Sequence, residues 1–202
     1  MFTEYEVETF MQVPEVKELV KDLKRQFLKE EAQFFEISDH DFLSLILMTP
    51  PIGVANANGN ISLFEELALN KLARKMSKGG YFLKADPVAH GMKYLIKSFD
   101  KWEETFLNAI KLCMNKTIDF DDLKSTLGDK EPSFDHLPSE LKVVPYIFVR
   151  YLSSFFLPGG EDVVEQHNVS RVEYDKILAI GQTLGIDHLP FFKIFCTTFK
   201  VK

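Results

Sequence analysis

The chain has 202 residues, of which 46% are hydrophobic and 27% are charged. That length favours one domain with a substantial core, and this composition excludes a globally disordered chain. Only two cysteines are present, which excludes a disulfide scaffold. The formal net charge of −6 disfavours nucleic acid as a partner, because an acidic protein repels phosphate groups.

The cysteines and the apolar runs indicate a cytoplasmic protein. Cys113 and Cys196 lie in apolar periodic segments and form no CxxC motif, so we expect two reduced, buried thiols. The first residues are acidic and lack the basic start and apolar run of a signal peptide. The longest apolar stretch, Phe42 to Met48, is far shorter than the roughly 20 residues of a membrane span, so we predict none.

Apolar residues recur at three- and four-residue steps in nearly every segment, which predicts an all-α fold of about 8–9 helices. Pro14 suits a first helical turn, and Phe42 to Met48 is apolar on all sides, as in a central buried helix. We expect Pro50-Pro51 to stop that helix. The expected buried stripe of the preceding helix is Val16, Val20, Leu23, Phe27 and Phe34.

Further helices are expected up to about residue 127. One closes at Gly79-Gly80, the next starts at Asp86-Pro87, and Asp100 caps another. A short helix is expected over 119–127. The stripe expected to face the core in the first of these helices is Phe64, Leu67, Leu72 and Met76, and in the helix capped by Asp100 it is Trp102, Phe106, Ile110 and Cys113.

The remaining chain gives a second helical unit. Residues 128–138 are polar and turn-rich, which predicts a loop. We expect a helix over 139–157 with a kink at Pro145, and no segment shows the clean alternation in hydrophobicity that would argue against an all-α fold. The predicted organisation is one domain over 1–202, with an N-terminal helical extension (1–37), a first unit (38–127), the loop and a second unit (139–202). The apolar stripes of its last two helices are Val172, Ile177, Ile180 and Leu184, then Phe191, Phe192, Phe195 and Phe199.

An internal repeat links the two units. Leu43 to Met48, followed by two prolines, is similar to Leu152 to Leu157, followed by Pro158. Ile61 to Glu65 aligns with Val169 to Glu173. We interpret this pattern as a pseudo-duplicated helical hairpin, with chance similarity as the alternative.

The repeated Ser-x-x-Glu has two interpretations. The first is a capping box, in which Ser62 or Ser170 caps a helix and the glutamate reaches back to the cap amide. The second is a divalent-metal site, because the first loop matches several positions of an EF-hand loop. Val54 stands where an EF-hand has its first Asp, so such a Ca²⁺ or Mg²⁺ site would be weak. Its ligands would be Asn56, Asn58 and Glu65, and those of a second loop Asp162, Glu165 and Glu173.

The run Val54 to Glu65 resembles the "A-x-A-D-G-x-[IV]-S-x-x-E" signature of the tellurite-resistance TerB-like family, and Val169 to Ile186 resembles its later "I-S-x-x-E … L-G-I" stretch. The resemblance spans roughly 42–195. It implies a compact all-helical domain with a duplicated hairpin, a stress-associated role, and acidic residues that hold divalent metal at the loop–helix junctions. Asn58 replaces the signature Asp, which leaves metal binding open.

No catalytic motif is present. None of the five histidines follows a Glu at the spacing of a di-iron site, and the densest polar cluster, Asp39-His40-Asp41, is better explained as a helix start capped by Ser38. We therefore predict a non-enzymatic interaction module with a protein partner or self-association. The alternatives are a weak metal-binding or sensing protein, and an enzyme with a dispersed site.

Phenylalanine, with 19 residues, is interpreted as packing material for the core. Two doublets stand apart, because adjacent helical residues cannot face the same way. One member of each doublet must face a second helix or a partner, and we predict an interface there. The doublets are Phe155-Phe156 and Phe191-Phe192, and the phenylalanines expected in the core are Phe27, Phe34, Phe42, Phe64, Phe99, Phe106, Phe148 and Phe195.

Overall fold

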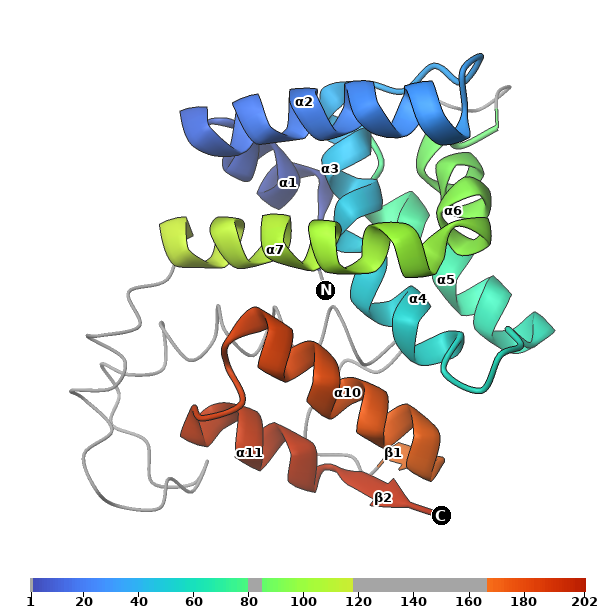
Figure 1. Ribbon diagram of the computed structural model, residues 1–202, viewed down its shortest axis with the longest axis vertical. Coiled ribbons are helices and arrows are strands. Elements are labelled where there is room, and N and C mark those ends of the chain that lie inside the picture. The colour runs from blue at the N-terminus through green and yellow to red at the C-terminus, as the bar shows by residue number, and fades with distance from the viewer. Residues whose placement is uncertain (1, 80–84, 118–166) are drawn as a thin grey trace.

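The computed structural model describes residues 2–79, 85–117 and 167–202. These residues form the predicted all-α fold, with one small two-stranded sheet near the C-terminus (Figure 1). The expected helices over 119–127 and 139–157 and the expected loop at 128–138 lie outside the described residues. The elements in chain order are α1 (Glu4–Met11), α2 (Pro14–Glu31), α3 (Asp39–Leu47), α4 (Thr49–Ala55), α5 (Leu63–Met76), α6 (Pro87–Lys97), α7 (Phe99–Thr117), β1 (His167–Val169), α10 (Arg171–Leu184), α11 (Pro190–Thr197) and β2 (Phe199–Val201).

Helix α3 is the centre of the fold, as its all-round apolar sequence predicts. Every residue from His40 to Leu47 is buried, and the helix contacts α1, α2, α5, α6 and α7. Helices α2 and α7 cross it one above the other, and α10 and α11 lie beyond α7 (Figure 1). The helices around α3 are amphipathic and bury one stripe each, because they have only one side to pack.

Helix α3 ends just before Pro50 and Pro51, as expected, but a new helix begins at the prolines. Helix α3 ends at Leu47, and both prolines occupy the first turn of α4, which continues to Ala55. A proline is tolerated in a first turn because its missing N–H would have no helical partner there. Met48 serves as the C-cap of α3 and the N-cap of α4, so α4 follows α3 with no connecting loop between them.

Aromatic rings join α2, α3 and α7. Phe27 lies 5.6 Å from Phe42, 5.1 Å from Trp102 and 5.8 Å from Phe106 between ring centroids. The Trp102 indole N–H donates to Glu31 at 3.0 Å, so the buried ring leaves no unsatisfied donor. Such ring pairs stabilise a core by about 0.5–1.5 kcal/mol each beyond their buried area. The predicted core role of these three phenylalanines is confirmed.

The C-terminal helices pack onto this core through α10. Helix α10 contacts α4 and α7. Helix α11 lies against α10 at Gly181, where a Cβ atom would come within 2.3 Å of the Phe192 ring. The glycine therefore makes room for the ring.

Strands β1 and β2 pair in parallel, with Asn168 opposite Lys200. This small sheet is a local addition to the all-α fold that the sequence pattern does not reveal. Each strand has only three residues, too few to show alternation in hydrophobicity. Phe199, expected at the end of the last helix, lies on β2.

Candidate functional site

The first predicted metal loop ends in a capping box. The Ser62 hydroxyl accepts from the Glu65 amide at 3.3 Å, and Glu65 Oε2 accepts from the Ser62 amide at 2.7 Å and the Ser62 hydroxyl at 2.5 Å. Asn58 Oδ1 accepts from the Asn60 amide at 3.0 Å. Gly59 supplies the sharp turn with a φ of +82°. The Glu65 carboxylate is thus held against the start of α5.

The second junction has the same construction. The Ser170 hydroxyl accepts from the Glu173 amide at 3.3 Å, and Glu173 Oε2 accepts from the Ser170 amide at 2.5 Å. Asp162 and Glu165 lie outside the described residues. Within the described ranges, no three His, Cys, Asp or Glu side chains are grouped so that they could hold a metal ion. Metal binding at either loop stays a prediction.

His40 and Asp41 form a buried polar link between three helices. The Asp41 carboxylate accepts from the Ser38 hydroxyl and the Lys78 amide, each at 2.8 Å, which joins the start of α3 to the end of α5. His40 Nε2 lies 3.1 Å from the Glu4 carbonyl of α1, and its Nδ1 lies 3.5 Å from Asp41.

The surroundings of His40 raise its pKa. Burial lowers that pKa, but the hydrogen bonds to Asp41 and to the Glu4 carbonyl, with the negative charges of Asp41 and Glu8, raise it by more. Asp41 itself is fully buried, at 0% exposed. The cluster is therefore a structural link, as the capping interpretation of this segment anticipated.

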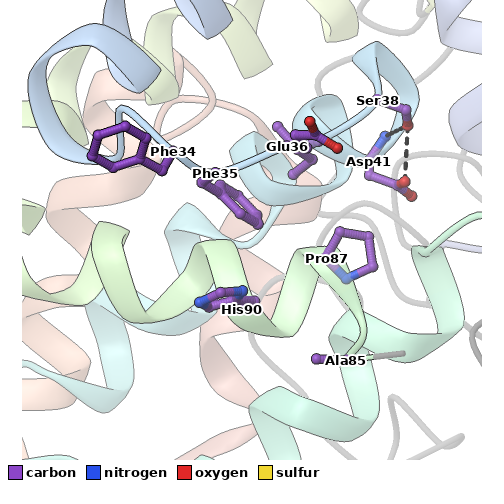
Figure 2. A pocket seen from close by; sticks show the side chains of 9 residues that line it. Phe34, Phe35, Glu36, Ser38, Asp41, Ala85, Pro87 and His90 are labelled. Atoms are coloured by element: carbon purple, nitrogen blue, oxygen red, sulfur yellow. Dashed lines mark hydrogen bonds between the residues drawn. The ribbon is translucent and has the colours of Figure 1, made fainter. Parts of the chain in front are cut away.

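A pocket of about 530 Å³ opens beside this cluster, between the α2–α3 connection and the start of α6. Figure 2 shows Ser38 and Asp41 hydrogen-bonded to one another, with His90 on the other side of Pro87. The His90 ring packs against Phe35, with 4.9 Å between the ring centroids. Among the lining residues that the structure describes, His90 is therefore not paired with the Ser38 hydroxyl. Its described lining is Phe34, Phe35, Glu36, Ile37, Ser38, Asp41, Ala85, Pro87 and His90.

The two cysteines are poor nucleophiles. Neither cysteine forms a disulfide and both are buried, and burial raises the pKa of Cys113 to about 12 and that of Cys196 to about 11. The thiolate, which is the reactive form, is therefore scarce at neutral pH.

The outer side of α5 carries an unexpected apolar surface. Leu63, Phe64 and Leu67 are 68%, 84% and 58% exposed. We call these three residues the apolar half of the α5 outer face. Leu67 lies four residues from Leu63 and three from Phe64, so its side chain adjoins both and links the three into one patch over the first two turns.

The expectation that Phe64 and Leu67 face the core is therefore wrong. The residues that α5 buries are Leu69, Leu72, Ala73 and Met76, on the opposite side of the helix. The segment contains two apolar stripes, one exposed and one buried, and the expected core-facing set combined residues of both. Two stripes out of phase on one short helix are the signal that could have revealed the surface. Phe34, also expected in the core, is 100% exposed at the rim of the pocket.

The second half of the same face is basic. Lys71, Arg74 and Lys75 are exposed and follow the apolar half along α5. We call them the basic half of the α5 outer face. None of the three forms an ion pair with a residue that the structure describes, whereas Lys101 and Lys116 pair with glutamates at 2.5 and 2.6 Å. These three exposed cations lie next to an exposed apolar patch on a chain with a net charge of −6.

The predicted phenylalanine interface is only partly within the described residues. Phe192 is 2% exposed and packs on Gly181, so it faces a second helix of its own chain. The side chain of Phe191 and the doublet Phe155-Phe156 are outside the described set.

Comparison of the chain with models of known families, with curated proteins and with solved structures gives no match. The resemblance to the TerB-like family therefore stays a prediction. Among the described residues, no helix is long and apolar enough to cross a membrane.

Proposed function

We propose that this protein is a non-enzymatic helical module that acts by binding another protein through the α5 outer face. The observation that carries this proposal is the exposure of Leu63, Phe64 and Leu67 on a single face of one helix. A scattered exposed apolar residue needs no explanation, but a contiguous group of large ones marks an interaction surface.

The energetics support a binding role for this patch. Burial of a leucine or phenylalanine side chain stabilises a complex by about 1.5–3 kcal/mol. Three such residues, flanked by charges that add specificity, resemble the apolar centre and polar rim of a protein interface. The buried thiols favour a cytoplasmic location for this activity. The TerB-like resemblance would place it in a stress response.

Site-specific photo-crosslinking tests this function. A benzoylphenylalanine in place of Phe64 is expected to form a discrete, protease-sensitive adduct in an extract of the protein's own cells. The matched control places the same probe at Val172, which is 52% exposed in the first turn of α10. Adducts that are equally abundant at both positions, or absent at Phe64, would contradict the proposal.

A further inference from the structure

We propose that the partner of the α5 outer face is an acidic amphipathic helix. Its apolar anchors cover the apolar half, and its carboxylates pair with the basic half. This inference rests on the proposed function, since it names the chemistry of the partner at that same surface.

The order of side chains along α5 determines the spacing of the partner's groups. A helix rises 1.5 Å per residue, so the centres of the apolar and basic halves lie about 12 Å apart along the axis. A helix lying alongside α5 would match this distance with anchors and carboxylates about eight residues apart. Its anchors would recur at three- and four-residue steps, because Phe64 and Leu67 do so on α5.

A helix fits this surface better than an extended peptide does. An extended peptide binds by adding to a sheet edge, whose free N–H and C=O groups satisfy its own backbone. The middle of a helix offers no such groups, because its backbone is already hydrogen-bonded internally. A segment covering α5 must therefore satisfy its own backbone, which a helix does along its whole length.

The charges indicate that the partner is acidic. Lys71, Arg74 and Lys75 are spaced three and four residues apart, so like charges face one another along α5 without an acidic neighbour between them. Carboxylates from outside the chain would relieve this repulsion and steer the encounter.

The same charges disfavour an anionic membrane as the occupant. Lipid-binding clusters contain about 4–8 basic residues, and α5 has three on a chain of net charge −6. The acidic remainder of the chain would be repelled by the lipid phosphates.

Two synthetic peptides test the inference on the full chain. Both carry the same leucine and phenylalanine anchors. One carries glutamates about eight residues from the anchors, and the other carries lysines at the same places. We expect the acidic peptide alone to bind the native protein in fluorescence anisotropy, more weakly as salt increases. Reversal of the basic half (K71E, R74E and K75E together) is expected to weaken this binding about tenfold.

Matched variants separate the effect of charge on peptide binding from the effect of damage to the fold. The triply reversed variant should gain affinity for the lysine peptide, which a misfolded protein would not. Phe64→Ser should weaken both pairings about tenfold. Val172→Ser on α10 should weaken neither.

The remaining outcomes overturn the inference in distinguishable ways. Equal binding of the acidic and basic peptides, or no binding while the Phe64 adduct persists, would refute an acidic helix but leave the protein interface standing. Dimers in sedimentation that disappear in Phe64→Ser would identify a second copy as the occupant. Binding to vesicles with anionic lipid, lost in Phe64→Ser, would refute both the acidic helix and the proposed function.

Discussion

Helices α5 and α10 share their length, their cap and their buried positions, but their outer faces differ. Each has 14 residues and begins with a serine capping box. At the same four positions counted from the cap, α5 buries Leu69, Leu72, Ala73 and Met76, and α10 buries Ile177, Ile180, Gly181 and Leu184. The cap and the buried stripe are what these two helices need in order to form and pack.

Their outer faces differ, although each exposes an apolar residue at its second helical position, Phe64 on α5 and Val172 on α10. Where α5 carries Leu63 and Leu67, α10 carries Arg171 and Asp175, which form an ion pair at 3.0 Å. The basic half of α5 corresponds to Ala179, Gln182 and Thr183 on α10. The difference shows that packing in this fold does not require an apolar and basic outer face. The composition of the α5 outer face is therefore explained better by a partner than by the fold.

The largest effect on stability is expected at the one buried position where the two helices differ in size. Gly181→Ala would place a methyl group 2.3 Å from the Phe192 ring, whereas α5 has Ala73 at the same position. We expect a loss of about 1–3 kcal/mol in urea unfolding, because an overpacked core must shift. Phe192→Leu in the same chain should recover part of it, and an unchanged midpoint in Gly181→Ala would show that α11 does not depend on this contact.

The serine caps of α5 and α10 should contribute equally to the free energy of unfolding. Ser62→Ala and Ser170→Ala are each expected to lower the free energy of unfolding by about 1 kcal/mol, because each leaves the amide of a first-turn glutamate without its acceptor. Denaturant titrations of the two variants side by side measure this. A cost at Ser62 several times that at Ser170 would break the equivalence of the two helix starts.

Glu65 should act as a cap and not as a calcium ligand. Its carboxylate accepts from the Ser62 amide and hydroxyl, so we expect millimolar Ca²⁺ to leave the melting temperature unchanged. A bound ion would raise that temperature by mass action. A rise that disappears in Glu65→Gln would restore the metal hypothesis.

The two helices should differ in their response to pH. Asp41 ties the end of α5 to α3, and His40 beside it has a raised pKa. A raised pKa means that protonated His40 stabilises the folded state. This contribution is complete below the unfolded value of about 6.5 and is lost as the pH rises through the higher folded value.

Hydrogen exchange between pH 6 and 8 should therefore show weakening around α1, α3 and the end of α5 before α10. His40→Gln should remove the difference, and the exposed His188→Gln should not. Uniform weakening of all helices would contradict a local role for His40.

The smallest effect on stability is expected at the surface that we propose for binding. Phe64→Ser and Val172→Ser should each change the free energy of unfolding by no more than about 0.5 kcal/mol, since both side chains are mostly solvent-exposed. A loss near that of a core residue in Phe64→Ser would show that the ring is packed in solution, and the proposed interface would fail.

The helices and their caps follow from local features of the sequence. Ser38, Ser62 and Ser170 cap helices as predicted, because a cap is decided by residues within one turn of each other. The all-round apolar character of α3 likewise revealed that it is central. These signals are local, so no knowledge of distant parts of the chain was needed.

Which of the two apolar stripes on α5 is covered depends on the packing of the other helices. Phe64 and Leu72 are both apolar, and which side meets α3 and α6 depends on how those helices are placed. The same holds for Phe34, for the pairing of two three-residue strands, and for the contact of Phe192 with Gly181. Periodicity identifies the faces of a helix, but burial depends on neighbours that are remote in the sequence. The exposed surface of α5 became visible for that reason only in the folded chain.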